Sequence, residues 1–582
     1  MGGIARAGHP ASPRRPPAFR AYGLVAVPVV AHLVLAWRRR WMQEDGFIDV
    51  RIVQQLLAGH GPVFNAGERV EAYTSPLWIA ILAVLRIVTL GSVSIEWLAV
   101  VSGIGLAVIG TVGLVAGAVS LWTPPGQESR RARWLPFGAL VLIALPPLWD
   151  FSSSGLENGL ALGWFGTSFA LVARSQHPDR LPRARTLVLL LGLGPLIRPE
   201  MVLYSAGLIA TLVIVGIRPR RRVGTDASPW WTFVVAGGAI PLGYQIFRMG
   251  FFAAAVPNTA LAKNAANEQW GQGWRYLTNF TGPYVLVIPL LVVLAAAVGS
   301  NLRWTSSRLV VAFGVVVPAL LNGLYVVAIG GDYMHARFLL LPLAALMAPL
   351  AAVPIPDGLE LRRFVPRLGA VVALAIWAVA TIGWWRPPLS DHGVDDEHHL
   401  FTASSGHSHP IHPGDQPPFF VDIAARFKAH VGQDVFLDQP EPPAPLGTYQ
   451  RPRGSGLAVQ FGALGIVGDE LGPRVFLFDY LGLADPIASR MAPVLGTRAG
   501  HTHDLPRPWR LARAGVGIPG DQYVAAARRA MECGALGRYL AGISGPLTPG
   551  RFLVNIWRAV GNTELQVPTD PTAAAAEFCG PG

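Results

Sequence analysis

The chain has 582 residues, of which 52% are hydrophobic and 14% are charged, and its mean hydropathy is +0.40. Because soluble domains carry about 25% charged residues, this composition excludes an ordinary soluble protein and indicates a polytopic membrane protein. The net charge of +12 falls in short clusters between apolar segments, a pattern typical of cytoplasmic loops that argues against nucleic-acid binding.

The N-terminal segment 1–20 is basic and rich in proline. It has no small-residue cleavage site after an apolar core, so we expect a retained first membrane helix and a short cytoplasmic tail, not a removed signal peptide.

Apolar segments long enough to be considered as spanning helices follow one another up to residue 385, since a span needs roughly 17–25 mostly apolar residues. They are 21–37, 75–90, 97–121, 134–149, 157–174, 185–197, 200–217, 230–249, 282–299, 308–329, 337–353 and 364–385.

Arginine clusters predict the orientation, because short basic loops favour the cytoplasmic side. The clusters are Arg14/Arg15/Arg20, Arg130/Arg131/Arg133, Arg174 to Arg185, Arg218 to Arg222, Arg303/Arg308 and Arg362/Arg363/Arg367. If every candidate spanned, the cluster at 130–133 would lie outside. Segment 75–90 is short and contains Pro76 and Arg86. We therefore predict that it lies along the outer interface or dips in and returns, which leaves 11 spans with the N-terminus inside and the C-terminus outside.

Three arginines, Arg38 to Arg40, do not fit this scheme, because they follow the first span and would lie outside. Either the basic N-terminal tail outweighs them in setting the orientation, or they bind a phosphate.

The region 386–582 contains no further candidate span and holds short apolar runs with turn residues. We expect an outer domain that is β-rich or α/β, with some helix near 521–540. Its two cysteines, Cys533 and Cys579, can pair in an oxidising compartment, which would stabilise the domain by about 4 kcal/mol. The alternative is two buried free thiols.

With this topology, the unusual polar motifs all fall on the outer face. They are "WMQEDGFIDV", "GERVEAYTS", "SGLENG", "LIRPEM", "VPNTALAKN", "GQGWRYL" and "GGDYMHARF". Ionisable groups at membrane depth are costly and are functional candidates by default. We therefore favour one shared polar cavity over unrelated polar loops.

The first outer loop contains a helical stripe of apolar residues, "GFIDVRIVQQLLAG", which predicts an amphipathic helix ended by Gly59. This helix is too short to span and would lie in the interface plane. Glu44 and Asp45 would sit just before its N-terminus, where an anion is stabilised by roughly 0.3–1 kcal/mol. Asp45 is either a simple N-cap or a functional carboxylate that acts as base or nucleophile on a sugar, or binds a divalent cation.

A histidine-rich stretch follows the last span. It contains His392, His398, His399, His407, His409 and His412, with Asp395, Asp396 and Glu397. This content suits a transition metal, but no helical ligand pair is recognisable, so we interpret the stretch as a flexible linker or loop. A divalent ion (Mg²⁺, Mn²⁺ or Ca²⁺), if one is used, would be expected first near Asp45.

The order of these motifs resembles that of the GT-C glycosyltransferases, membrane enzymes that use polyprenyl-phosphate sugars. Within them it is most similar to the mycobacterial terminal β-1,2-arabinofuranosyltransferases, the AftB family. The resemblance rests on "GHGPVFNAGERVEAYTSPLW", "SGLENG", "IRPE", "PNTALAK", "GGDYMHARF", "DYLGLADPIASR" and the Gly500–His501 pair, and so covers nearly the whole chain.

The resemblance implies a mainly α GT-C membrane domain over 21–385, with a first outer loop at 38–96. It also implies a periplasmic, glycan-binding domain over 386–582 and a location in the plasma membrane. The donor would be decaprenyl-phosphoryl-arabinofuranose. The acceptor would be the non-reducing end of arabinan, in arabinogalactan and lipoarabinomannan. Donor and product linkages are both β in this family, so the expected outcome is retention, by two displacements at a carboxylate or by a front-face reaction.

Such enzymes commonly have an essential carboxylate in the first outer loop, which matches Asp45 or Glu44. The family pattern often reads Asp-Asp where this chain has Glu44-Asp45, so Asp45 is the first catalytic candidate. The candidates for binding the donor phosphate are Arg198, Lys263, His335 and Arg337. The candidates for binding substrate are Glu68, Glu157, Glu200, Asn258, Trp274, Asp332 and Tyr333. His335 has a structural alternative, and Trp and Tyr also line membrane interfaces without a catalytic role.

Other functions compete with this one. A transporter or flippase of a lipid-linked sugar would also have many spans, but transporters usually show internal repeats around a midplane site, and we find no repeat of fixed period. A GT-C enzyme that uses a different polyprenyl-phosphate sugar is a second alternative. A non-catalytic wall-binding scaffold would not explain polar residues at the bilayer margin.

Overall fold

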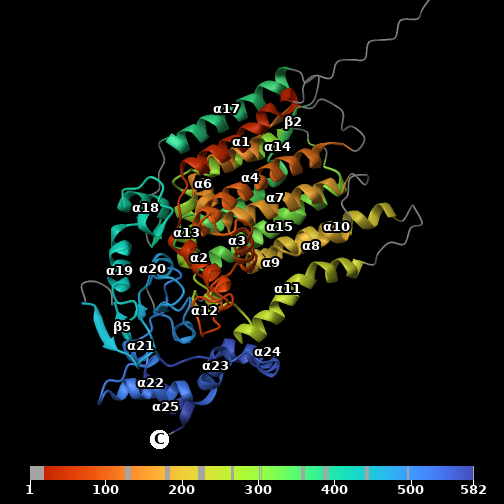
Figure 1. Cartoon of the computed structure of the whole chain (residues 1–582). Helices are drawn as coiled ribbons and strands as arrows, with labels where there is room; N and C mark the ends of the chain where they lie inside the picture. The colour runs from red at the N-terminus through yellow and green to blue at the C-terminus, as the bar shows by residue number, and fades with distance from the viewer. Residues whose placement is uncertain are drawn as a thin grey trace, which may run out of the picture.

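The computed structural model describes residues 19–124, 133–176, 184–220, 230–263, 268–299, 302, 304–355, 361–383, 390–391, 393–439, 445–494 and 497–580. Several basic segments used for the predicted orientation, including 1–18, 125–132 and 221–229, lie outside this part. A bundle of helices runs up to residue 383, and a second region of helices and short strands gathers at one end of the bundle (Figure 1).

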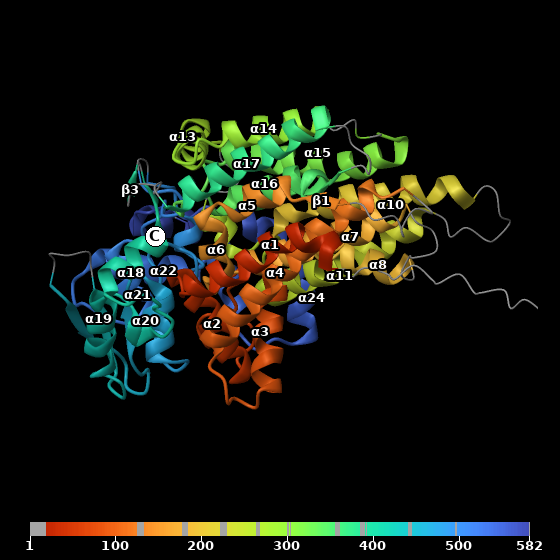
Figure 2. The ribbon, with the colours of Figure 1, turned by 90° about the horizontal axis from the view of Figure 1, so that it is seen from above.

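The bundle is a stack of roughly aligned helices, as both views show (Figures 1 and 2). Its helices are α1 (Phe19–Arg38), α4 (Ile95–Trp122), α5 (Phe137–Ile143), α6 (Pro146–Ser153), α7 (Asn158–Arg174), α8 (Ala184–Leu191), α9 (Gly194–Ile197), α10 (Val202–Arg220), α11 (Trp230–Phe252), α14 (Val287–Gly299), α15 (Ser306–Ala328), α16 (Leu340–Met347) and α17 (Leu361–Gly383). Short 3₁₀ helices are η2 (Pro199–Met201), η3 (Arg337–Leu339) and η4 (Ala348–Leu350). An antiparallel strand pair, β1 (Arg133–Leu135) with β2 (Val353–Ile355), lies at the end of the bundle away from the second region.

Within the described residues, two helices, α4 and α15, are long and apolar enough to cross a membrane by length and composition. Several other predicted spans are interrupted. Segment 134–149 begins as β1 and breaks before Pro146 and Pro147, because proline disfavours helix in the residue before it. Segment 337–353 starts in η3 and ends in β2. The count of about 11 spans stays a prediction.

Helices α4 and α7 pack with almost no space between their backbones. Gly110 and Gly113 on α4 face Gly163 and Gly166 on α7. A Cβ atom added to Gly163 would lie 2.7 Å from the carbonyl oxygen of Leu106, and one added to Gly166 would overlap the backbone of Gly110. Small residues that let two helices approach closely are typical of membrane helix pairs.

The first loop carries α2 (Glu44–Leu57) and α3 (Pro76–Val88). The predicted helix exists, but Gln43 is its N-cap, and Glu44 and Asp45 form its first turn. The polar face of α2 is buried as well as its apolar face, so protein encloses the helix on both sides. Whether it lies in the plane of the membrane interface stays a prediction. Helix α20 (Leu464–Leu471) covers the polar face, and the Arg51 guanidinium donates to the carbonyls of Gly468 (2.6 Å) and Val475 (2.6 Å). The periodicity of the α2 sequence could not show that α20 packs on it, because Arg51 and its partner Gly468 are 417 positions apart in the chain.

Helix α3 is the segment predicted to lie at the interface without spanning. Its side chains Val84, Ile87 and Val88 are exposed, whereas Trp78 and Leu82 are buried. The predicted position of this helix at the outer membrane interface stays a prediction.

The second region contains a four-stranded sheet in the order β6-β5-β7-β8. Strand β5 (Val435–Asp438) pairs antiparallel with β6 (Gly447–Gln450) and parallel with β7 (Ala458–Gln460), which pairs parallel with β8 (Phe476–Phe478). A short pair, β3 (Ser390–Asp391) with β4 (Val394–Asp395), precedes the sheet. This arrangement is α/β, and strands are its minor part.

The helices of this region are α18 (Glu397–Ser405), η5 (Pro413–Asp415), α19 (Pro418–Lys428), α20, η6 (Ala488–Arg490), α21 (Arg507–Arg513), α22 (Gln522–Glu532), α23 (Gly534–Ser544), α24 (Pro549–Glu564) and α25 (Pro571–Cys579). Two further helices between the spans, α12 (Asn258–Ala262) and α13 (Trp270–Thr281), lie at the same end of the bundle. The histidine-rich stretch is therefore partly helical and is not a flexible linker in its described part; His392 lies outside the described residues.

Cys533 and Cys579 form a disulfide, the first of the two possibilities that the sequence left open. It links the turn between α22 and α23 to the end of α25. The closed loop has a sequence separation of 46 residues, which corresponds to about 4 kcal/mol in the chain-entropy model.

The glycine interface predicts that Gly166→Ala destabilises the protein by about 1–3 kcal/mol, because the new methyl group must push two backbones apart. Gly105→Ala is the matched control on α4, where an added Cβ meets nothing within 4 Å, and it should be neutral or stabilising by roughly 0.5–1 kcal/mol. Thermal unfolding of both variants in detergent tests this. Equal melting temperatures would contradict the close approach.

Candidate active site

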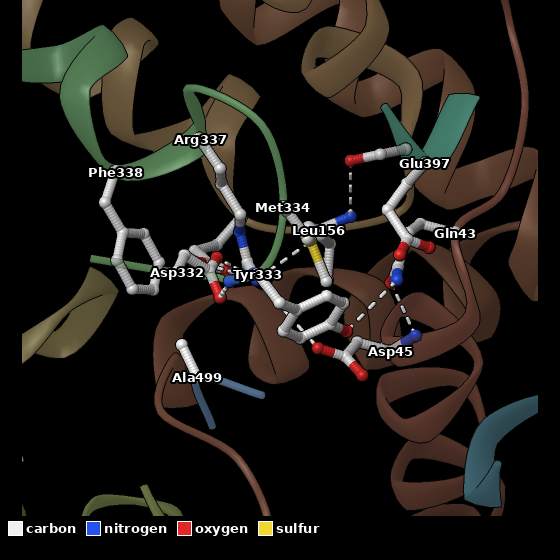
Figure 3. Close-up of polar contacts among 12 residues, drawn as sticks. Gln43, Asp45, Leu156, Asp332, Tyr333, Met334, Arg337, Phe338, Glu397 and Ala499 are labelled. Atoms are coloured by element: carbon white, nitrogen blue, oxygen red, sulfur yellow. Dashed lines mark hydrogen bonds and ion pairs between the residues drawn. The ribbon is translucent and has the colours of Figure 1, made fainter. Parts of the chain in front are cut away.

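Asp45 lies in the first turn of α2, where the helix N-terminus faces the rest of the molecule. Its backbone N–H donates to Gln43 Oε1 (2.5 Å), so Gln43, and not Asp45, caps the helix. Gln43 Nε2 in turn donates to the Tyr333 hydroxyl (3.4 Å), which ties the first loop to the "GGDYMHARF" motif (Figure 3). The Asp45 carboxylate therefore does not serve as the helix N-cap.

A cavity of about 340 Å³ opens beside Asp45, and we call it the aromatic cavity. Its ring-bearing wall is formed by Tyr333, Phe401, Phe419, Phe420, Phe461 and Tyr480. Its polar groups are Gln43, Glu44, Asp45, Glu397, Gln439, Arg498 and His501. The first loop, the 333 segment and the second region all contribute. Aromatic faces with a few convergent polar groups are typical of a small-molecule or sugar site.

A second cavity of about 140 Å³, which we call the basic cavity, is lined in part by the 332–337 segment. It gathers Arg198, Lys263 and Arg337, three of the four residues predicted to bind the donor phosphate. The predicted substrate residues Glu200 and Asp332 line it too. Apolar side chains from the end of α15 and from η3 complete its wall, namely Tyr325, Val326, Ile329 and Phe338.

Arg337 joins the two cavities. Its buried guanidinium lies 3.9 Å from Asp45 Oδ2 and 3.5 Å from Asp332 Oδ2 through Nη1, and 3.3 Å from Glu157 Oε1 through Nη2. Asp45 lines the aromatic cavity and Arg337 lines the basic cavity, so their ion pair marks the border between them (Figure 3).

Arg198 is held firmly in the basic cavity. Its guanidinium donates to Glu157 (2.5 Å) and to Glu200 (2.5 Å) and stacks on the Phe338 ring at 4.2 Å. Glu157 therefore accepts from two arginines, Arg198 and Arg337, and fixes their spacing. Lys263 differs from the two arginines, because its ammonium group forms no ion pair with a described residue.

A loop of the second region lies between the cavities. Arg498 and His501 line the aromatic cavity, whereas Ala499 and Gly500 line the basic cavity. The Arg498 guanidinium lies 4.3 Å from the centre of the Tyr333 ring, and the His501 ring meets the same tyrosine edge-on at 4.9 Å. The two cavities are therefore completed by residues far apart in the chain.

Glu397 and Arg498 are site residues that sequence reasoning missed. Arg498 donates to Glu397 Oε1 (2.8 Å) and also pairs with Asp395. Burial raises the pKa of Glu397 to about 7, although Arg498 opposes this effect. The acidic triplet at 395–397 is the available signal, but nothing in the sequence indicates that Glu397 lines a cavity with Asp45.

Glu44 lies beside Asp45 and lines the same cavity. Burial, and then the neighbouring charge of Asp45, raise the pKa of Glu44 well above its usual range. Its Oε1 accepts from the backbone N–H of Gly465 (2.5 Å), a glycine that the α2–α20 contact requires. Glu44 therefore favours its neutral form and anchors α20, and the two adjacent carboxyl groups have different surroundings.

Five of the residues predicted for substrate or phosphate do not line either cavity, although one of them, Glu157, pairs with the cavity residues Arg198 and Arg337. Trp274 is 62% exposed on α13, and Glu68 pairs with Arg513 at 2.9 Å. Asn258 donates to the carbonyl of Gly482 (2.7 Å). His335 bonds to Tyr284 (2.9 Å) and Asn279 (2.6 Å), and burial lowers its pKa to about 3, which suits the structural alternative.

Within the described residues, no group of three or more His, Cys, Asp or Glu side chains is arranged to hold a metal ion. His398 Nδ1 lies 2.9 Å from Arg39 Nη2, and its ring packs edge-on against Trp41, so this histidine belongs to a buried polar network. At Asp45 the neighbouring positive charge is the Arg337 guanidinium.

The raised pKa of Glu397 predicts a pH-dependent stability. Between about pH 4.5 and 7 the folded protein binds a proton that the unfolded chain has lost, so the free energy of unfolding falls as pH rises, by up to about 1.4 kcal/mol per pH unit. Glu397→Gln should remove this contribution, whereas Glu470→Gln, at an exposed ion pair with Lys428, should not. Melting temperatures across this window measure it. Identical pH slopes for wild type and Glu397→Gln would contradict the assignment.

Comparison with known proteins agrees with this arrangement of motifs. Residues 452–577 match the model of the AftB family C-terminal domain. The terminal β-(1→2)-arabinofuranosyltransferase of Mycobacterium tuberculosis is 34% identical, over 92% of this chain and 94% of that protein. The enzyme of the same name from Corynebacterium glutamicum is 31% identical, over 93% of this chain and 85% of that protein. A weaker structural similarity, with a TM-score of 0.45 and 14% identity, covers 79% of this chain and 90% of ArnT from Cupriavidus metallidurans bound to undecaprenyl phosphate.

Both relatives match more than nine-tenths of this chain, at 34% and 31% identity. The chain is therefore a membrane glycosyltransferase and belongs to the family of terminal β-(1→2)-arabinofuranosyltransferases.

Proposed function

We propose that this arabinofuranosyltransferase takes its sugar from decaprenyl-phosphoryl-arabinofuranose and adds it to the non-reducing end of cell-wall arabinan, in arabinogalactan and lipoarabinomannan. The observation that carries the proposal is the Asp45–Arg337 ion pair at the border between an aromatic and a basic cavity. A sugar held across this border would present its anomeric carbon to Asp45 while its phosphate lies among cations.

The basic cavity suits the lipid phosphate. Arginine forms bidentate bonds to phosphate, and lysine supplies a mobile point charge. Arg198 and Arg337 are positioned by Glu157, while Lys263 is the cation available to the incoming anion. The apolar side chains at the end of α15 give the first isoprene units of the donor a path along the bundle.

The aromatic cavity suits the acceptor, which is an uncharged glycan. Its rings offer flat apolar faces to the sugar, and Glu44, Glu397 and Gln439 can bond to hydroxyl groups. It is also the larger cavity, as an oligosaccharide end requires. The second region supplies most of its wall, which supports a glycan-binding role for residues 386–582.

Both linkages are expected to be β, so the proposed reaction proceeds with retention. Asp45 attacks the anomeric carbon, and the C–O bond to the lipid phosphate breaks with the electron pair leaving on the phosphate. The acceptor hydroxyl then displaces Asp45 and loses its proton to a base at the cavity, for which Glu397 is suitably placed. Arg337 holds Asp45 in place and can bond to the leaving phosphate.

The proposed membrane placement puts the cavities and the second region on the periplasmic face. The two cavities lie at the end of the bundle where the second region gathers. At the opposite end lie Arg174, in the last turn of α7, and Arg308, in the first turn of α15. Arginine at this end favours the cytoplasmic side. The 11 crossings remain part of the proposal.

Arabinose transfer from purified lipid donor to a synthetic arabinan acceptor tests the proposed roles. Asp45→Asn should lower kcat by about 10²–10⁴-fold, because it removes the reacting carboxylate. Lys263→Ala should instead raise KM for the donor by about 10–100-fold, the loss of one charge-assisted bond. Lys428→Ala, at an exposed ion pair, is the control and should change neither. Full transfer by the Asp45→Asn variant would show that the catalytic assignment is wrong.

Reporter fusions test the placement. A fusion at residue 92 should report the outer side and one at residue 130 the cytoplasmic side, because one span lies between them and segment 75–90 does not cross. An outer location for residue 130 would overturn the orientation without affecting the assignment of Asp45.

A further inference from the structure

Helix α24 carries an apolar face that the rest of the described chain leaves uncovered. Leu553, Trp557 and Val560 follow one another at helical spacing, and they are 66%, 89% and 54% exposed. Val554 extends the same face. A soluble domain rarely exposes a contiguous row of large apolar side chains unless the row meets a partner.

The opposite, polar face of α24 is attached to the end of a bundle helix. Asn555 Nδ2 donates to the carbonyl of Gly250 and Asn562 Nδ2 to that of Ala253, both at 2.9 Å. Thr563 Oγ1 accepts from the backbone N–H of Ala255 (2.8 Å). These hydrogen bonds satisfy backbone groups at the C-terminal end of α11. A rotation of α24 that buried its apolar face would break these hydrogen bonds.

The position of this attachment indicates what covers the apolar face. On α11 itself, Leu242 (63%) and Ile246 (55%) are exposed along the side of the bundle, where a membrane helix meets lipid tails. Helix α24 lies at the end of α11, across the direction of the bundle (Figure 1). Its exposed face therefore continues the exposed apolar side of α11.

We propose that α24 is a membrane-surface helix of the second region, with Leu553, Trp557 and Val560 inserted among the lipids at the outer face. Tryptophan is enriched at membrane–water interfaces, and an amphipathic helix with basic residues binds there in the plane of the surface. Arg558, exposed beside Trp557, would meet anionic lipid phosphates. The helix holds the second region against the membrane, which keeps its loop at 498–501 over the cavities.

A second helix shows the same features at another side of the bundle (Figure 2). On α13, Trp270 (46%) and Trp274 (62%) are exposed, and Gly273 packs against Val327 at the end of α15. The tryptophan predicted to bind substrate thus lies where a membrane-interface residue would lie. Both helices cap the ends of long bundle helices on the side of the cavities.

Spin labels on the full chain in nanodiscs of phosphatidylglycerol and phosphatidylethanolamine test the proposal. Labels at Leu553→Cys and at Trp557→Cys should collide with oxygen, which partitions into lipid, and be shielded from a water-soluble nickel chelate. Their oxygen-to-nickel collision ratio should be several-fold higher than at Val431→Cys, a control 55% exposed at the end of α19. Val235→Cys on α11, which is 60% exposed, is the lipid-facing reference.

Ratios at 553 and 557 that equal the ratio at 431 would overturn the proposal. Exclusion of both reagents, with dipolar broadening between labels, would also overturn it, because a second copy of the chain would then cover α24. The readout needs no sugar transfer, so its failure is distinguishable from failure of the proposed reaction.

Discussion

The ion pairs of the buried Arg337 guanidinium hold the candidate active site together. A charge removed from water is costly unless it is paired, and Arg337 pairs with three carboxylates, those of Asp45, Asp332 and Glu157. These carboxylates come from α2, from the start of the 332–337 segment and from the N-terminus of α7. One cation therefore holds together three parts of the chain, and Arg198 extends the network through Glu157.

Around this network the two halves of the molecule are interdependent. The bundle provides rigid helices, with α4 and α7 locked by facing glycines, and it carries the cations of the basic cavity. The second region covers α2 with α20 and contributes Glu397 and Arg498 to the aromatic cavity. Because the bonds of Arg51 run to backbone carbonyls of the second region, the position of α2, and with it that of Asp45, depends on that region being in place.

The arrangement also separates two chemical environments within a short distance. Cations and apolar side chains border one cavity, whereas rings and carboxyl groups border the other. In the proposed reaction, a lipid phosphate and a neutral glycan need these different surroundings and must meet at the border between them. The loop at 498–501 contributes residues to both cavities, so one short segment borders both proposed substrate sites.

The sequence by itself determined the apolar bundle, the existence of a helix in the first loop, and the cations Arg198, Lys263 and Arg337. Apolar length, 3.6-residue periodicity and the cost of charge near lipid are local signals, and they can be read without a fold. The motif order also indicated the family that the relatives establish. Only the tertiary structure decided that Glu397 and Arg498 line the same cavity as Asp45, that α20 covers α2, and that His335 and Trp274 lie outside the cavities. These outcomes depend on contacts between residues up to several hundred positions apart, and local patterns carry no information about which distant segment will cover which side chain.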